Sequence, residues 1–394
     1  MNIRQLIKPK GNKVIWTAVV VLMIASFLAV YSSTSVLAYQ KMGGNTSFYM
    51  LKHLGMLLMG FGTIFLFHRI SIRYINGLST PMLLFSIGLL VLALVGGQSI
   101  NNSSRWISVG GFSIQPSEFA KVTMVIYVAM QLGKKEHIDN PGRAFWHIIV
   151  PLAVVCGLIL IENLSTAGLV GGSCFVMMFV GRVPWRYLLS TAAVGIGFLV
   201  LVFLFAPYLP LPRAQTWHNR IVRHFTASEE TENSDENYQI QQALMAVSTG
   251  GFIGRGPGNS YMKNFLPMAF SDFIFAIILE EYGMWGGIVI LLCYWALMMQ
   301  CLSIMRACRR AFQLYLVMGL GLLISLQVCI NVAVCLGIMP VTGQTLPMVS
   351  MGGSSNLFIG MAIGLILSVS REVQEQQQEE EAEARAGAEA EMVE

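Results

Sequence analysis

Apolar runs of about 20 residues alternate with short polar segments along most of the chain. A helix of about 20 residues crosses the hydrocarbon core of a bilayer, where backbone groups must bond within the helix because no water is present. The pattern therefore predicts an all-α polytopic membrane protein. Its ten transmembrane helices are expected at about residues 14–31, 49–68, 76–96, 116–133, 144–162, 165–181, 185–206, 271–302, 312–336 and 351–370.

The basic residues predict the orientation of these helices. Most of the 25 Lys and Arg fall on one side, which places both termini in the cytoplasm (N-in/C-in). The first run is too long for a signal peptide, so we interpret it as a retained helix. The expected organisation is a cytoplasmic N-terminus at 1–13, a membrane domain at 14–370 with one long periplasmic loop at about 207–270, and an acidic disordered cytoplasmic tail at 371–394.

Composition excludes several function classes. The chain is 55% apolar and only 12% charged, whereas soluble domains are about 25% charged. Its seven cysteines have no metal-ligand spacing and are expected to be free thiols. No basic cluster is interleaved with aromatic residues, so we expect no nucleic-acid partner. The Gly-rich stretch at 250–258 lacks the Lys of a phosphate-binding loop. The outer face of a membrane has no supply of nucleoside triphosphate, and the chain has no nucleotide-binding motif. The functions that remain for that face are transport and group transfer from an activated lipid.

Polar side chains gather in four places on the predicted outer side. The first contains Arg105, Gln115, Glu118 and Lys121. Glu118 and Lys121 are three residues apart and share one helix face. A local ion pair that offsets its own burial explains them as well as a functional site does. The second group surrounds Arg220 in the long loop, where ordinary loop polarity is the simpler explanation.

The third place is the start of the eighth predicted span. Ser271 or Asp272 could cap that helix, and its N-terminal dipole favours a carboxylate. Glu280 and Glu281 lie two to three turns deeper and cannot cap it. Two carboxylates at that depth are expensive, so we assign them to structural support.

The fourth place combines Asn331 with the Gly- and Pro-broken segment 337–347 and the serines that follow it. Irregular backbone at membrane depth is tolerated only where protein buries it or where it lines a wet cavity. Ser354 and Ser355 at the start of the last helix offer backbone N–H groups to an anion such as a phosphate.

In their order along the chain, these four groups resemble the SEDS family (shape, elongation, division and sporulation proteins) over about residues 14–370. The most specific motifs are Gln-Pro-Ser-Glu at 115–118 with Lys121, Ser-Asp-Phe-Ile-Phe at 271–275 with Glu-Glu-Tyr-Gly at 280–283, and Pro-Val-Thr-Gly at 340–343 leading to Gly-Gly-Ser-Ser at 352–355. Within the family, the chain is more similar to the cell-division members than to the elongation members.

The resemblance implies a peptidoglycan glycosyltransferase at the outer face of the cytoplasmic (inner) membrane. The donor would be a glycan on undecaprenyl diphosphate and the acceptor would be lipid II. Expected partners are a class B penicillin-binding protein, which supplies transpeptidation, and other membrane proteins of the division machinery. The family's essential carboxylate corresponds to Asp272, and Arg105, Glu118 and Lys121 correspond to positions that line the outer cavity.

The chain departs from the family pattern in places. Met268, Phe270 and Ser271 replace the usual Glu, His and Thr, and Asn163 replaces a usual Asp. A charged role at position 163 is therefore in doubt, whereas Asp272 is intact.

Our hypothesis is a single inverting displacement at an anomeric carbon. Asp272 acts as the general base, while Lys121 and Arg105 stabilise the leaving diphosphate. A divalent cation, Mg²⁺ or Mn²⁺, could assist. Gln115, Arg220, Ser354 and Ser355 are candidate substrate-binding residues.

Two alternatives remain open from the residues alone. A lipid II flippase would use intramembrane charges and broken helices equally well. A non-catalytic scaffold of the division machinery would depend on its tail and helices and not on Asp272. Polar groups on the outer side favour an enzyme over a scaffold, and only the family resemblance favours an enzyme over a flippase.

Overall fold

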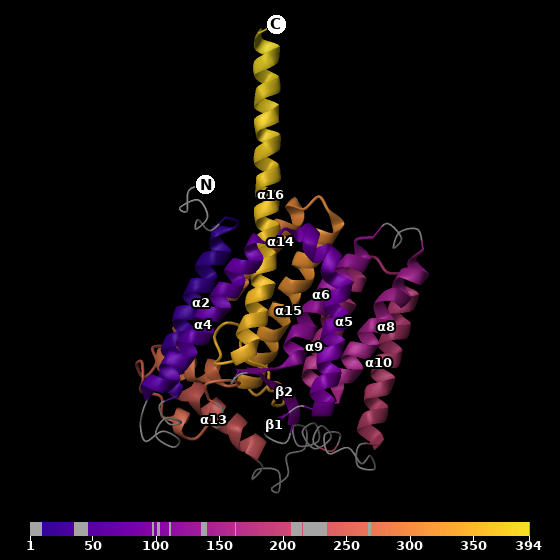
Figure 1. Ribbon diagram of the computed structural model, residues 1–394. Coiled ribbons are helices and arrows are strands. Elements are labelled where there is room, and N and C mark those ends of the chain that lie inside the picture. The colour runs from indigo at the N-terminus through magenta and orange to yellow at the C-terminus, as the bar shows by residue number, and fades with distance from the viewer. Residues whose placement is uncertain are drawn as a thin grey trace.

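The computed structural model describes residues 10–34, 46–96, 98–100, 103–109, 112–134, 140–161, 163–205, 215, 235–266 and 269–393. Helices dominate these residues (Figure 1). Their bounds are α2 Lys13–Ser33, α4 Thr46–Arg69, α5 Ile72–Gly96, α6 Pro116–Leu132, α8 Pro141–Leu160, α9 Leu164–Val180, α10 Trp185–Phe205, α13 Asp235–Gly250, α14 Ile274–Ala307, α15 Ala311–Cys335 and α16 Gly353–Val393, with a short 3-10 helix, η1, at Met262–Asn264.

The apolar runs of the sequence form helices of membrane-spanning length. Within the described residues, 8 helices are long and apolar enough to cross a membrane: α2, α4, α5, α8, α10, α14, α15 and α16. The apolar α9 has only 17 residues, and α6, also of 17 residues, contains Glu118 and Lys121. The chain is thus a mostly helical, polytopic membrane protein, while the count of ten spans stays a prediction.

Helix α6 forms the centre of the bundle. It packs against α5, α8, α9 and α15, and every residue in it except Phe119 is buried. Helix α10 is the opposite case, because it packs mainly on α9 and leaves side chains such as Val194 and Ile196 more than 60% exposed. An apolar helix that is bare of protein on most sides is suited to lipid contact.

The structure differs from the all-α expectation between α5 and α6. Three antiparallel strands lie there in the order β1-β2-β3: β1 Gln98–Ile100, β2 Ser103–Val109 and β3 Phe112–Ile114. In the β2–β3 pair, Ile107 is opposite Ile114 and Val109 is opposite Phe112. These strands are too short to register as apolar runs, so a search for membrane spans passes over them.

The predicted long loop contains ordered structure. Helix α13 packs against α14 and lies at the same end of the bundle as the strands (Figure 1). The Gly-rich stretch after it leads into η1. Residues 206–214, 216–234 and 267–268 lie outside the described residues.

The acidic tail also differs from its expectation. Instead of a disordered segment, it continues α16 as a helix to Val393 and projects from the bundle at the end opposite α13 (Figure 1). Its Glu, Gln and Ala residues have high helix propensity, which explains the difference. Ion pairs to the bundle, Glu375 with Lys10 (3.0 Å) and Glu380 with Arg309, attach its first turns.

Candidate active site

Asp272 lies in the turn that precedes α14 and is half-buried. Its Oδ1 accepts a hydrogen bond from the Ser271 hydroxyl (3.0 Å), and its Oδ2 would lie 3.8 Å from a Cβ atom placed on Gly343. The carboxylate therefore faces the irregular segment between α15 and α16. The prediction that Ser271 or Asp272 caps α14 is wrong, because the N-cap residue is Phe273 and no side chain caps the helix. Capping does not explain Asp272.

The segment 336–352, between α15 and α16, is irregular throughout and includes Gly343 and Met348 at positive φ. Ser350 ties it to the turn that carries Asp272. Its hydroxyl donates to the Ser271 carbonyl (2.6 Å) and accepts from the Leu346 amide (2.8 Å). The predicted irregular backbone is therefore present, and residues 344–350 of it are mostly buried by protein, whereas Ile338 and Met339 are exposed. Its depth in the membrane stays a prediction.

Two side-chain amides of α15, one turn apart, hold this segment in place. Asn331 Nδ2 donates to the backbone carbonyls of Asp272 (2.9 Å) and Gln344 (2.7 Å). Gln327 Nε2 donates to the carbonyl of Thr345 (2.9 Å). Both amides are at most 1% exposed, so these bonds satisfy carbonyls that no water can reach. Asn331 thus fixes the backbone position of Asp272.

Lys121 and Glu118 form an ion pair of 2.8 Å on α6. The Lys121 side chain is only 1% exposed, and its Nζ also donates to Gln327 Oε1 (3.3 Å). Lys121 is therefore linked to the segment 344–345 through Gln327. Glu118 Oε2 is buried without a hydrogen-bond partner. This geometry joins the first and fourth polar groups of the sequence and encloses Lys121 rather than exposing it to a ligand.

The start of α16 joins the same network. Ser354 Oγ accepts from the backbone N–H of Gln115 (3.1 Å), and Ser355 Oγ lies 3.1 Å from Thr345 Oγ1. Ser354 is 1% and Ser355 is 7% exposed. The structure thus brings Gln115, Ser354 and Ser355 to the end of the bundle that holds Asp272.

Other predicted residues cannot be placed at the site. The backbone of Arg105 belongs to β2, but its side chain lies outside the described residues, as does the whole of Arg220. Asn163 is the N-cap of α9 and accepts from the Thr166 amide (3.2 Å). This cap gives the uncharged Asn at position 163 a structural role.

Glu280 and Glu281 hold the Gly-rich loop. Glu280 accepts from the Ser260 hydroxyl and from the amides of Tyr261 (2.9 Å) and Met262 (3.3 Å). Glu281 accepts from the Ser32 hydroxyl and the Ser260 amide. Both are at most 1% exposed. Their contacts agree with the structural role expected of them.

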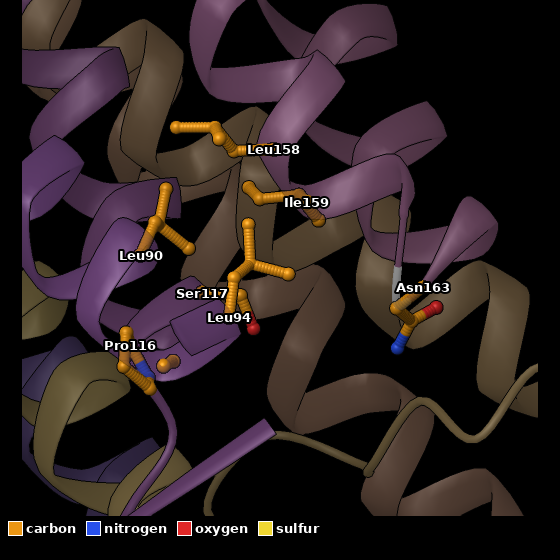
Figure 2. A pocket seen from close by; sticks show the side chains of 8 residues that line it. Leu90, Leu94, Pro116, Ser117, Leu158, Ile159 and Asn163 are labelled. Carbon is orange, nitrogen blue, oxygen red and sulfur yellow. The ribbon is translucent and has the colours of Figure 1, made fainter. Parts of the chain in front are cut away.

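A pocket near the start of α6 is too small for a sugar. It lies between α5, α6 and α8, lined by Pro116, Ser117, Asn163 and apolar side chains (Figure 2). Its cavity volume is about 10 Å³. That volume holds at most one water molecule.

Several residues of the site escaped sequence analysis. Gln327, Gln344 and Thr345 carry the links described above, and Gln344 Nε2 also donates to Thr166 Oγ1 (2.8 Å). Gln327 could have been predicted from the sequence, because it is a polar residue within an apolar span and such residues usually have a partner. Within the described residues, no group of three or more His, Cys, Asp or Glu side chains could hold a metal. The divalent cation stays a prediction.

Comparison with known proteins decides the family. The FtsW/RodA/SpoVE family, described as "Cell cycle protein", matches residues 12–375. The chain belongs to this family. The resemblance to SEDS proteins is therefore confirmed, and family membership together with the apolar helices makes the chain an integral protein of the inner membrane.

Individual relatives match over nearly their whole length. Stage V sporulation protein E of Bacillus subtilis is 36% identical over 89% of this chain and 94% of its own. The probable peptidoglycan glycosyltransferase FtsW of Nitrosococcus halophilus is 33% identical over 93% of this chain and 94% of its own.

Solved structures of the FtsW/RodA/SpoVE fold are also similar. A chain from a study of polymerization and crosslinking by a peptidoglycan synthase complex matches with a TM-score of 0.70 and 25% identity, over 92% of this chain and 98% of that one. Thermus thermophilus RodA matches with a TM-score of 0.64 and 26% identity, over 92% and 97%.

Proposed function

We propose that this protein is a peptidoglycan glycosyltransferase that polymerises lipid II into glycan strands during cell division. The observation that carries the proposal is the placement of Asp272. It is half-buried in the turn before α14, and Asn331 fixes its backbone by donating a hydrogen bond to its carbonyl. The names of the FtsW relatives and of the peptidoglycan synthase complex support the reaction class. The proposed topology has ten spans, both termini in the cytoplasm and Asp272 on the periplasmic side.

In the proposed mechanism, Asp272 is the catalytic base. It takes a proton from the acceptor sugar hydroxyl while that oxygen attacks the anomeric carbon of the donor, and undecaprenyl diphosphate leaves. One direct displacement inverts the anomeric configuration. Because Asn331 and Ser350 anchor the turn around Asp272, the carboxylate is positioned before substrate arrives.

Lys121 has a different role in this mechanism from the one expected from sequence. Its burial and its pairing with Glu118 favour a positioning residue that acts on the site through Gln327. Stabilisation of the leaving diphosphate is then assigned to Arg105, Arg220, Gln115 and the N-terminus of α16 at Ser354 and Ser355, with a divalent cation as an assisting group.

The proposed partners follow from the relatives. A solved structural neighbour belongs to a peptidoglycan synthase complex that coordinates polymerization and crosslinking. We infer that a class B penicillin-binding protein supplies the transpeptidation here, and that lipid II and an undecaprenyl-diphosphate-linked glycan are the substrates.

The test is polymerisation of labelled lipid II by the purified protein with its penicillin-binding partner. Asp272→Ala should lower the rate by about 10²–10⁴-fold while the protein stays monodisperse. Asp235→Asn, at the start of α13, is the matched control and should keep the wild-type rate. Normal glycan synthesis by Asp272→Ala would overturn the assignment. Movement of lipid II across vesicles without any polymer would instead identify a flippase.

A further inference from the structure

The end of the bundle opposite Asp272 contains two arginines that form no ion pair with an acidic side chain among the residues that the structure describes. Arg69 is the last residue of α4, and Arg371 lies on α16 beside it, with its Nη1 donating to the Arg69 carbonyl (3.3 Å). Arg371 is 17 residues beyond Ser354 on the same helix, which is roughly 26 Å along the axis. That distance is close to the thickness of the hydrocarbon core, so the pair lies at the other membrane boundary.

The hydrogen-bond donors of these two guanidinium groups are unusually poorly satisfied. Arg69 Nε and Nη2 and Arg371 Nε are buried atoms without a hydrogen-bond partner. Arg69 also stacks over the Phe65 ring, with its Cζ atom 4.9 Å from the ring centroid. Arginine does not lose its proton in proteins, so burial cannot neutralise this charge. An enclosed donor without a partner is unfavourable, because it has lost its hydrogen bonds to water.

Nearby acidic side chains are committed to other partners. Both oxygens of Glu372 are engaged, one by the Ser71 hydroxyl and the Ile72 amide and the other by Gln313. Glu375 pairs with Lys10. The chain contains no Asp or Glu before Glu118, so its first 117 residues cannot supply a counter-ion. The unpaired donors of the two arginines therefore have no acceptor among these acidic side chains, and another molecule can supply one.

We propose that Arg69 and Arg371 bind a phosphate group, most simply that of an anionic phospholipid in the leaflet at this end of the bundle. The planar fork of a guanidinium matches the oxygens of a phosphate. Both residues are only half-buried, so part of each is accessible from outside the bundle. Basic pockets between helices at a membrane boundary are suited to anionic head groups.

The experiment measures lipid retention by native mass spectrometry of the full-length protein released from detergent. The probes are phosphatidylglycerol and zwitterionic phosphatidylcholine, added at equal concentration. Wild type should retain one phosphatidylglycerol in preference to phosphatidylcholine. Arg69→Gln/Arg371→Gln should reduce the lipid-bound fraction by roughly tenfold or more, because two charge-assisted contacts are lost.

Arg73→Gln is the matched control, since Arg73 is an exposed arginine at the second position of α5, at the same boundary. It changes the surface charge without touching the pair and should retain the lipid. Arg69→Lys/Arg371→Lys keeps both charges and should show an intermediate lipid-bound fraction. This variant distinguishes loss of the phosphate contacts from a folding defect in the double Gln variant.

A further arm separates the two sources of phosphate. If millimolar inorganic phosphate displaces phosphatidylglycerol and raises the melting temperature of the wild type but not of the double Gln variant, the same site binds free phosphate. Equal retention by wild type and the double Gln variant would overturn the proposal. So would an equal loss in Arg73→Gln, which would show that diffuse surface charge holds the lipid.

Discussion

Helix α14 and the turn that precedes it carry carboxylates in two contrasting environments, eight residues apart in the sequence. Glu280 and Glu281 are at most 1% exposed and receive hydrogen bonds from the Gly-rich loop and from Ser32. Asp272 is half-buried, and its position is fixed through its backbone carbonyl. A carboxylate enclosed by donors of its own chain holds that chain together. A carboxylate whose backbone is anchored, as that of Asp272 is by Asn331, keeps its place in the chain when its side chain changes proton or partner.

The largest expected effect is a difference in thermal stability between a variant of Glu280 and a variant of Asp272. Glu280→Ala leaves the Ser260 hydroxyl and the amides of Tyr261 and Met262 unpaired in a buried site. The cost should be roughly 5 kcal/mol, since each buried unpaired donor costs about 1–3 kcal/mol. Thermal melting in detergent checks this. Asp272→Ala is the counterpart and should melt within a few degrees of wild type, so equal destabilisation by the two variants would break the comparison.

The next largest effect tests whether Glu118, like Glu280 and Glu281, is a carboxylate that its own chain neutralises and holds. Lys121→Met leaves Glu118 buried without its ion-pair partner, and we expect a loss of about 3 kcal/mol or more. Lys121→Met/Glu118→Gln removes both charges and should recover most of that loss. The melting temperatures of the single and double variants form the measurement. If the double variant were as unstable as the single one, the ion pair would not explain the burial of Lys121.

The smallest effect tests how Asp272 is positioned. Asn331→Ala removes the donor to the Asp272 and Gln344 carbonyls and should lower stability by about 1–2 kcal/mol. The polymerisation rate, kcat, should fall by more than this stability loss explains. The matched control is Ser248→Ala, whose exposed hydroxyl donates to the Met245 carbonyl within α13, and its kcat should equal that of the wild type. A proportional fall in folded protein and rate would leave Asn331 with a purely structural role.

Sequence analysis located the helices because bilayer thickness imposes a length that is visible in the apolar runs. Asp272 and the pair Glu280–Glu281 were also visible in the sequence, since charges in or beside an apolar run stand out. It missed the strands between α5 and α6, which are too short to produce such a signal. It treated the tail as solvated and disordered, although Glu, Gln and Ala favour a helix that continues from α16.

The connections within the site were beyond sequence reasoning. Gln327 and Asn331 are one turn apart, which predicts that they share a face of α15, but not that they reach the carbonyls of Thr345, Gln344 and Asp272. These contacts depend on how the irregular segment folds back against α15. In the same way, the burial of Lys121 follows from the central place of α6 in the bundle and not from its local sequence.

Helix α16 is one uninterrupted element that begins beside the site at Ser354 and ends far outside the bundle. Its 41 residues correspond to a rod roughly 60 Å long. Twist or pull applied to the protruding part would reach Ser354 and Ser355 with no flexible joint in between. The fold therefore connects the protruding part of α16 rigidly to the end of the bundle that holds Asp272.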